Sequence, residues 1–543
     1  MSVCWLSGRM NDRGNSYTSH VMKLTLGLLM TLLTAFAWQK PRTGLTAITG
    51  HAPPSNVLFD FQQRVVDSSQ LRTEGASVSQ VAGRLRIGVA NPGDGAPSAF
   101  LLPRRGHWDL SRYRYLEIDI HNSGRIPANV SAFAFVPGGF GGISTYPLHE
   151  NGREPIRPGA QHTLKIDLHQ RYPDNTESID PRNITQVRLV LNNGVHGTQI
   201  DVLRVRATGE GPVEAHDVSG RLLVPQVTEG LPGPGKRVHM TLAGSPVRYV
   251  LYLPKDWDPD GSFPVIAEYS GNISYFKNTY STGKADQGHI GYGMSKGSGA
   301  IWVNLPFISL DRTHEQLDGF GNLDATAEYA RKVVREVVEK YSGDPGAVFL
   351  TGFSRGGAAC GFIGLHNKET ADVWLGFHAL AGGDGAGWFG SEMPGAIERA
   401  GLMKGRSSFI TDGAPWQDVL ARLKQPFTYM DSGIGAHVDT MVLDNRPSSL
   451  ALRKWMAEVL KDRPGVHDIS GTVLNRDGQP LSGARVESGY THFTLTDRDG
   501  RYTLRSLVNG ERSVTVRLPG VHFDSRSVAM TGKPLTGLDF QAR

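Results

Sequence analysis

The hydrophobic pattern of the chain changes character twice, and the first part is typical of β-structure. Between residues 56 and 206, short segments such as 84–89 and 115–120 alternate apolar and polar residues, with turn residues between them. A period of two that recurs without any long 3.6-residue period predicts strands, and many short strands predict a sandwich of two sheets. We therefore expect an all-β domain over residues 53–210.

A second pattern follows a segment rich in glycine and proline at 211–236, which predicts a linker. Apolar runs such as 263–269 then alternate with helical patterns. One predicted helix begins near Asn322 and places its apolar residues on a single stripe: Ala325, Tyr329, Val333, Val334, Val337 and Tyr341. Strands that alternate with helices predict a mostly parallel sheet covered by helices on both faces, here over residues 237–465.

Short strands return after residue 465, separated by Asp477-Gly478 and Asn509-Gly510 turns that are typical of β-hairpins. This pattern predicts a second, smaller sandwich over residues 466–543. The expected fold is therefore multidomain, with a central α/β domain flanked by two all-β sandwiches.

A candidate nucleophile lies between a predicted strand and a predicted helix. The apolar run 347–350 leads into Gly352-Phe353-Ser354-Arg355-Gly356, and the helix-compatible residues 358–360 follow. A G-x-S-x-G turn between a strand and a helix is a nucleophile elbow, which exposes the serine hydroxyl at a sharp corner. We expect Ser354 to be the nucleophile and the backbone N–H of Arg355, at the helix start, to face a developing oxyanion.

A serine nucleophile needs a histidine base, which in turn needs a carboxylate. His366 falls in the helix after the elbow and His378 within an apolar run, so neither is expected to reach the site. His437 follows a predicted strand and a glycine-bearing loop and precedes a predicted helix at 448–460, and we expect it to be the base.

Two residues are candidates for the acid. Asp412 stands directly after the predicted strand 407–411, and Asp384 lies in the glycine-rich loop 382–387 after the preceding strand. Both precede His437, as the chain order serine, acid, histidine requires. The pattern does not choose between them.

Residues 249–460 resemble the α/β-hydrolase superfamily, and within it the bacterial feruloyl and acetylxylan esterases. The Tyr252-Leu253-Pro254 opening, the elbow and the late histidine carry the resemblance. These esterases usually have His-Gly after the third strand, where this chain has Ser270-Gly271-Asn272, so the resemblance implies the N–H of Asn272 or Ile273 as the second oxyanion donor.

The arginine after the nucleophile is similar to that of glucuronoyl esterases. If the Arg355 side chain turns into the site, it would stabilise an oxyanion or hold a substrate carboxylate. The alternative is a surface arginine paired with a carboxylate.

The flanking domains also resemble known modules. Residues 108–122 are similar to jelly-roll carbohydrate-binding modules, in which Trp108, Tyr113 and Tyr115 would stack on sugar rings; the alternative is that these rings belong to the core. The last 75 residues or so resemble carboxypeptidase regulatory-like domains, an accessory unit of secreted bacterial proteins.

The N-terminus predicts export. Lys23 is followed by the apolar stretch 24–37, which ends in an A-x-A pattern, so residues 1–37 read as a signal peptide, with Met22 a candidate start. An uncleaved anchor is the alternative. We expect a secreted or periplasmic protein with no stable membrane span in the mature chain.

Composition excludes other classes. Lys plus Arg number 57 and Asp plus Glu 52, and this small excess is spread along the chain, which argues against nucleic-acid binding. Cys4 and Cys360 are the only cysteines, and no metal-binding or phosphate-cradling motif is present, so no cofactor is expected.

Taken together, these features predict a secreted serine esterase that acts through an acyl-enzyme at Ser354 and removes acyl groups linked to polysaccharide. A polyester depolymerase or a serine peptidase would use the same residues on another acyl group. A non-catalytic glycan-binding surface protein is the third alternative. The sequence carries no signal for the oligomeric state.

Overall fold

The computed structural model describes residues 56–90, 96–136, 139–140, 155–171, 178–192, 194–211, 221–274 and 281–543. The predicted signal peptide lies outside these residues, as does part of the predicted linker. Within the described residues, no helix is both long enough and apolar enough to cross a membrane.

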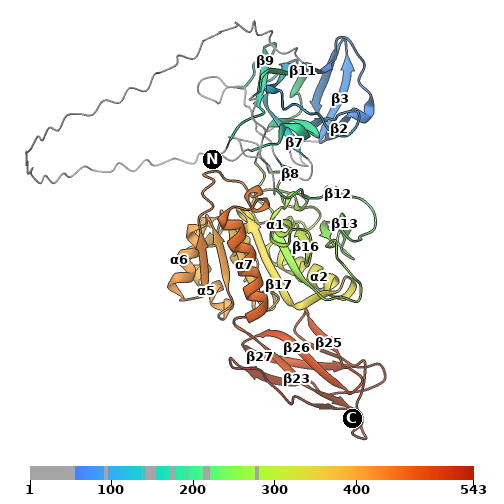
Figure 1. Cartoon of the computed structure of the whole chain (residues 1–543), viewed down its shortest axis with the longest axis vertical. Helices are drawn as coiled ribbons and strands as arrows, with labels where there is room; N and C mark the ends of the chain where they lie inside the picture. Colours follow the sequence, from blue (N-terminus) through green and yellow to red (C-terminus); the bar gives the residue numbers. More distant parts are fainter. Residues whose placement is uncertain are drawn as a thin grey trace, which may run out of the picture. The chain divides into compact units, whose positions relative to one another are not determined.

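The N-terminal domain consists of two sheets (Figure 1). One has the strand order β3 (Ala76–Val81), β4 (Arg84–Val89), β11 (Gln199–Glu210), β6 (Tyr113–His121) and β9 (Gln161–Asp167), with β1 (Asn56–Asp60) paired to β11. The other has the order β2 (Leu71–Glu74), β5 (Ser98–Leu101), β10 (Gln186–Asn192), β7 (Asn129–Val136) and β8 (Gly139–Phe140). All these pairings are antiparallel, as the alternating pattern predicts.

The core of this domain lies between the two sheets. Along β6 the residues Leu116, Ile118 and Ile120 are fully buried, whereas the residues between them are half-exposed. The alternation therefore turns one face of each strand inward, which is how the period of two in the sequence specifies the sandwich.

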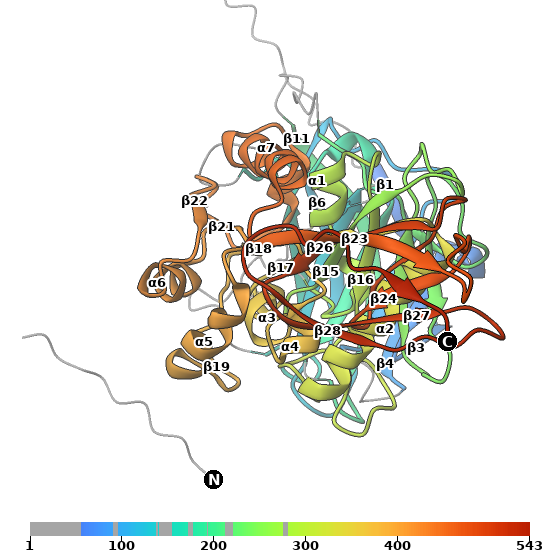
Figure 2. The same ribbon diagram turned by 90° about the horizontal axis from the view of Figure 1, so that it is seen from below.

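The central domain is built on one long mixed sheet (Figure 2). Its strand order is β12 (Val227–Thr228), β13 (Arg237–Thr241), β14 (Arg248–Tyr252), β16 (Ile301–Leu305), β15 (Phe263–Tyr269), β17 (Gly343–Phe353), β18 (Gly376–Leu380), β21 (Ser408–Thr411) and β22 (Phe427–Met430). From β16 to β22 every neighbouring pair is parallel. The carboxyl ends of these strands therefore meet at one edge, where loops from distant parts of the sequence come together.

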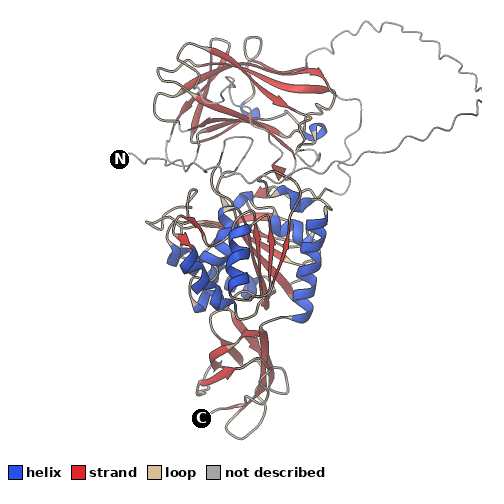
Figure 3. Ribbon diagram, turned by 90° about the vertical axis from the view of Figure 1, so that its left-hand side faces the viewer, coloured by secondary structure: helices blue, strands red, loops and turns tan. Residues whose placement is uncertain are grey.

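Helices cover both faces of this sheet (Figure 3). They are α1 (Ile290–Ser295), α2 (Leu323–Lys340), α3 (Arg355–Phe362), α4 (Lys368–Ala371), α5 (Met393–Ala400), α6 (Ala414–Arg422) and α7 (Pro447–Asp462). On β15, Val265 and Ala267 join the core under α2 and α3, while Ile266 joins the core under α1 and α7. Both faces of β15 are thus buried, as its continuous apolar run predicts.

The helix expected from Asn322 is confirmed. Asn322 caps α2 by accepting the N–H of Ala325 at 3.0 Å, and the predicted apolar stripe is buried except for Tyr341, which is half-buried just after the last residue of the helix. The linker expected over 211–236 differs in part, because β12 pairs in parallel with β13 and so extends the sheet into that segment.

Short 3₁₀ helices and a small hairpin complete the elements up to residue 465. The 3₁₀ helices are Ser68–Gln70, Pro181–Asn183, Ala285–Gln287, Gly401–Met403 and Thr440–Leu443, and the hairpin joins β19 (Ala386–Trp388) to β20 (Ser391–Glu392). The hairpin follows β18 directly, so it lies at the carboxyl edge of the central sheet.

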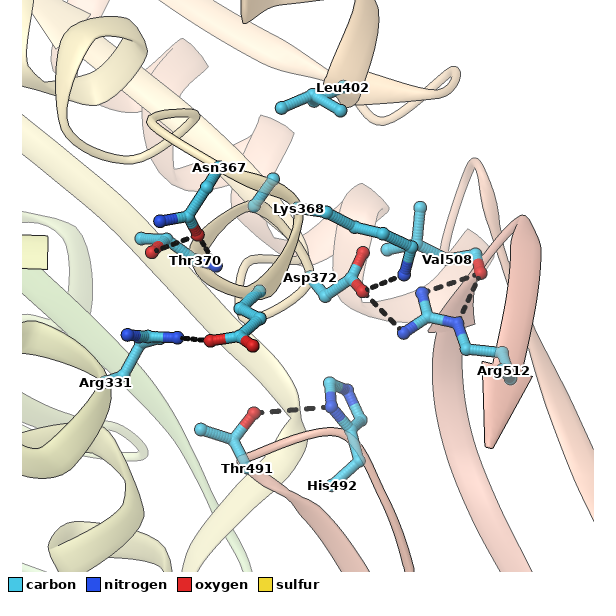
Figure 4. Close-up of polar contacts among 12 residues, drawn as sticks. Arg331, Asn367, Lys368, Thr370, Asp372, Leu402, Thr491, His492, Val508 and Arg512 are labelled. Atoms are coloured by element: carbon cyan, nitrogen blue, oxygen red, sulfur yellow. Dashed lines mark hydrogen bonds and ion pairs between the residues drawn. The ribbon is translucent and has the colours of Figure 1, made fainter. Parts of the chain in front are cut away.

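The C-terminal domain has two small sheets. One has the order β26 (Arg501–Val508), β23 (Val466–Leu474) and β29 (Phe540–Gln541), and the other the order β25 (His492–Leu495), β24 (Arg485–Ser488), β27 (Gly510–Arg517) and β28 (Arg526–Met530). Figure 4 shows Asp372, at the end of α4, accepting hydrogen bonds from Lys368 and from Arg512 of β27 at 2.6 and 2.7 Å. The Arg512 side chain is buried, so a charge-assisted contact ties β27 to the end of α4.

Candidate active site

Ser354 stands at a sharp corner between β17 and α3. Its backbone has φ 54° and ψ −111°, a combination that a non-glycine residue rarely adopts. The N–H of Ser354 donates to the carbonyl of Leu380 on the neighbouring β18 at 2.8 Å, which holds the corner against the sheet. The elbow expected from the sequence is therefore present as a strand, a strained serine and a helix.

Two glycines allow this corner to form. A Cβ on Gly352 would lie 2.3 Å from the backbone of Gly356, and a Cβ on Gly356 would lie 2.0 Å from the carbonyl oxygen of Tyr269 on β15. Real Cβ atoms do not come so close to backbone. Glycine is needed at both positions because α3 starts directly against the strands.

His437 reaches the serine from a loop that follows β22. Its Nε2 lies 2.9 Å from the Oγ of Ser354, and its ring packs on that of Phe353 with the ring centroids 4.7 Å apart. Partial desolvation lowers the pKa of His437, although the charges of Asp439 and Asp412 oppose the shift. A neutral imidazole at this distance is placed to accept the proton of the serine hydroxyl.

The two candidate acids have different surroundings. Asp384 is fully buried, and both of its oxygens accept hydrogen bonds from Arg399, at 2.8 and 2.7 Å. Burial raises the pKa of Asp384, and Arg399 opposes the shift. Asp412 lies at the end of β21 and accepts the N–H and the hydroxyl of Ser432, at 2.8 and 2.5 Å, at the start of the loop that carries His437.

Asp412 is therefore the better placed of the two acids. Its carboxylate is bonded to the loop of His437, and its charge opposes the lowering of the pKa of that histidine. Asp384 instead forms a bidentate ion pair with Arg399 of α5. This pair holds the loop of Asp384 against α5.

The candidate oxyanion donors also differ in whether their N–H groups are already hydrogen-bonded. The N–H of Ile273 donates to the carbonyl of Leu317 at 3.0 Å and is therefore engaged. Among the described residues, the N–H groups of Arg355 and Asn272 have no acceptor. Parallel pairing of Tyr269 with Gly352 brings the start of the 270–273 loop alongside the elbow.

The side chain of Arg355 corrects both expectations from the sequence, because it neither enters the site nor lies on the surface. It is fully buried, over the ring of Phe307, and it donates to four backbone carbonyls at 2.7 to 3.0 Å, those of Gly271, Gly283, Gln316 and Gly319. Burial lowers the pKa of Arg355 to about 9. The guanidinium is a clamp between loops, so Arg355 can offer only its N–H to a substrate.

The clamp supports the 270–273 loop from behind. The side-chain oxygen of Asn272 accepts the N–H of Gly319 at 2.8 Å, and its amide nitrogen donates to Asp318. Because Arg355 also holds the carbonyls of Gly271 and Gly319, one side chain fixes both the candidate oxyanion loop and its neighbour. The sequence carries no signal of this arrangement, since three separate loops must first come together.

The remaining histidines and the cysteine have structural surroundings. His366 pairs with Asp324 near the surface at 2.7 Å, and His378 is buried between Thr351 and Thr411, where burial lowers its pKa to about 3. Cys360 is buried in α3, and burial raises the pKa of its thiol. The described residues contain no group of His, Cys, Asp and Glu arranged to hold a metal ion.

The aromatic residues of the N-terminal domain lie in two settings. Trp108 is half-buried and meets Phe59 edge to face at 5.9 Å, and Tyr113 also packs against the core. Tyr115 lies on the outer face of β6, with the ammonium of Lys165 3.7 Å from its ring centroid. Trp108 thus fits the core alternative, and Tyr115 is the ring that faces outward.

Comparison with known proteins identifies the C-terminal domain. Residues 468–543 match the carboxypeptidase regulatory-like domain family. This match confirms the carboxypeptidase regulatory-like domain that the resemblance of the last 75 residues or so implies. The mouse (Mus musculus) carboxypeptidase N catalytic chain is 30% identical over 142 residues, which cover 25% of this chain and 30% of that protein.

Carbohydrate-binding modules are among the solved structures that resemble the chain. A family 29 module, the CBM29-2 mutant R112A, is 14% identical, with 30% of this chain and 98% of that chain covered and a TM-score of 0.20. A family 11 module from Clostridium thermocellum, solved with a β-1,3-1,4-mixed-linked tetrasaccharide, is 18% identical, with coverages of 29% and 96% and a TM-score of 0.21. At these scores the likeness says nothing about what the sandwich binds.

Proposed function

We propose that this protein is a serine hydrolase that cleaves carboxylic esters through an acyl-enzyme at Ser354. The observation that carries the proposal is the 2.9 Å contact between the Oγ of Ser354 and the Nε2 of His437, at a strained corner between a strand and a helix. A hydroxyl held in that way has a base within proton-transfer distance, and Ser354 is half-buried rather than enclosed.

The reaction follows from these positions. His437 accepts the proton of Ser354 as the Oγ attacks the ester carbonyl, and the oxyanion that forms is held by the N–H groups of Arg355 and Asn272. The imidazolium then protonates the leaving alcohol. A water molecule attacks the acyl-serine in the second half-reaction, with His437 again as base, and Asp412 stabilises the imidazolium in both halves.

The architecture supports the assignment to the α/β-hydrolase type. A parallel sheet with helices on both faces carries Ser354, Asp412 and His437 at the carboxyl edge of its strands, in the chain order that this superfamily uses. Asp412 is preferred over Asp384 because Arg399 occupies both oxygens of Asp384.

For the substrate, we propose acyl groups linked to an extracellular polysaccharide, with the protein exported by its N-terminal segment. A polar cavity of about 620 Å³ lies on the outer face of the N-terminal domain, lined by Asp60, Gln62, Asp119, Ile120, Gln161, His162, Thr163, Leu203, Arg204 and Arg206. Amide, carboxylate and guanidinium groups on one sheet suit a hydroxyl-rich ligand. Retention of the full chain on insoluble polysaccharide tests this part, and equal passage through polysaccharide and an inert matrix would contradict it.

The catalytic part is tested by turnover of p-nitrophenyl esters, acetylated and feruloylated xylan, a polyester and peptides, with Ser354→Ala as the matched variant. We expect ester turnover that disappears in Ser354→Ala while the circular dichroism spectrum is unchanged. The preferred substrate separates an esterase from a polyester depolymerase or a peptidase. Absence of turnover on every substrate would leave only a binding protein.

A further inference from the structure

A buried histidine and carboxylate pair lies directly beyond the candidate base. The Nδ1 of His289 is 2.8 Å from the Oδ2 of Asp439, and the two side chains are only 5% and 10% exposed. Asp439 is two residues after His437. Because a carboxylate only accepts hydrogen bonds, the proton of this bond lies on the Nδ1 of His289.

The loop that carries His437 needs such an anchor. It contains Gly433 and Gly435, both at positive φ, and it runs along the surface between β22 and the 3₁₀ helix 440–443. Its first end is held by Ser432 on the carboxylate of Asp412. The bond from His289 to Asp439 holds the second end, so the imidazole lies between two fixed points.

His289 is itself fixed to the sheet by a fully buried carboxylate. Glu268 on β15 accepts the backbone N–H groups of His289, Ile290 and Gly291, at 2.8 to 3.1 Å, and the indole N–H of Trp302 at 2.8 Å. Burial raises the pKa of Glu268, and the N–H groups of Gly291 and Ile290 at the start of α1 oppose the shift. β15 continues into Ser270 and the candidate oxyanion loop. Glu268 therefore lies on the strand that leads to this loop, and it also binds the backbone of His289, which supports the loop of His437.

We propose that His289 is a positioning residue, which acts through Asp439 to keep the imidazole of His437 within hydrogen-bond distance of Ser354. The inference rests on the proposed function, because it assigns the support of the base in that reaction. It differs from the role of Asp412, since His289 touches neither the base nor the nucleophile.

Asp439 also contributes its charge. Of the two carboxylates that oppose the lowering of the pKa of His437, Asp439 has the larger effect and Asp412 the smaller. The other charged groups around the pair are Glu268 on β15, Arg237 on β13 and Asp286 in the 3₁₀ helix 285–287. Removing the Asp439 charge must lower the pKa of His437, because a nearby anion favours the imidazolium.

The test uses variants that separate position from charge. His289→Ala removes the donor, whereas His289→Asn keeps an N–H close to the place of Nδ1. Asp439→Asn keeps an acceptor for His289 but removes the charge. The matched control is His366→Ala, which breaks a histidine and aspartate pair of similar length, 2.7 Å, away from the site.

The readout is kcat and KM on p-nitrophenyl acetate per active site, with active sites counted by the acylation burst. We expect His289→Ala to lower kcat by about 10-fold to 100-fold with KM within twofold, because a displacement near 1 Å costs on this order. His289→Asn should recover most of the loss, and His366→Ala should match the unmodified chain. Asp439→Asn should move the acid limb of kcat/KM to lower pH.

The outcomes distinguish this inference from the proposed function. If the unmodified chain has no Ser354-dependent turnover, the function itself fails. If turnover is normal and His289→Ala keeps its kcat per active site, the positioning role is overturned, even if fewer molecules fold. Should His289→Ala not fold, Asp439→Ala decides, because it removes the acceptor of the same hydrogen bond. A kcat per active site equal to that of the unmodified chain in Asp439→Ala contradicts the inference.

Discussion

Loss of the Arg355 clamp is expected to damage the protein in two separable ways. Arg355→Met removes a fully buried guanidinium and leaves four backbone carbonyls without their donor. A hydrogen bond from a charged group to a carbonyl contributes about 1.5–3 kcal/mol net to stability, but the cost of burying the charge offsets much of the sum over four bonds. A buried carbonyl left without a donor costs about 1–3 kcal/mol, so we expect a net loss of unfolding free energy of about 3 kcal/mol once the relief of the buried charge is subtracted.

A second buried arginine provides the control. Arg406 is also fully buried and also donates to four carbonyls, those of Ala371, Leu402, Met403 and Trp374, and burial lowers its pKa to about 9 as well. None of these four carbonyls belongs to the 270–273 or 316–319 loops. Arg406→Met should therefore cost similar stability without moving the oxyanion loop.

The assay compares urea unfolding with kcat per active site on p-nitrophenyl acetate, at a temperature where both variants are folded. Arg355→Met is expected to lose about 10-fold or more in kcat, because the N–H of Asn272 shifts from the oxyanion, and Arg406→Met is expected to lose less than twofold. A folded Arg355→Met with the kcat of the unmodified chain would refute the claim that the clamp positions the site.

Three further predictions concern the elbow, the base and the acid. Gly356→Ala should destabilise the protein by about 1–3 kcal/mol in urea unfolding, because its Cβ meets the Tyr269 carbonyl, whereas Gly401→Ala, whose Cβ meets nothing within 4 Å, should be neutral. The pH profile of kcat/KM should have an acid limb with its midpoint below 6.5, because desolvation lowers the pKa of His437 and only the neutral imidazole accepts the serine proton; a midpoint above 6.5 would contradict this. Asp412→Asn should lower kcat by about 10²-fold or more with little change in Tm, whereas Asp384→Asn should mainly lower Tm by breaking the Arg399 pair; the reverse result would exchange their roles.

Local patterns in the sequence are enough to select Ser354 and His437 as candidate site residues. A run of apolar residues, a small-residue turn and a helix-compatible segment suffice to predict the corner at Ser354, and a histidine in a glycine-bearing loop before a helix suffices to predict the imidazole that lies beside it. Both depend on neighbours within about ten residues. The α2 helix is predicted for the same reason, with Asn322 as its cap.

Local patterns could not choose between the two candidate acids, and they could not predict the contacts of Arg355. Asp384 and Asp412 each follow a strand, and only the side chain opposite each one, Arg399 or Ser432, separates them. Arg355 acquires its role from four carbonyls in distant loops, which no local pattern contains. Glu268 is different, because the sequence does contain a signal for it: a charged residue within an apolar parallel strand must be hydrogen-bonded to buried donors.

The most direct test of the central claim is covalent labelling with a fluorophosphonate, followed by peptide mass spectrometry. The account predicts one label per chain on the peptide that contains Ser354, none in Ser354→Ala, and strongly slowed labelling in His437→Ala. Absence of label on the unmodified folded chain, or equal labelling of Ser354→Ala, would contradict it.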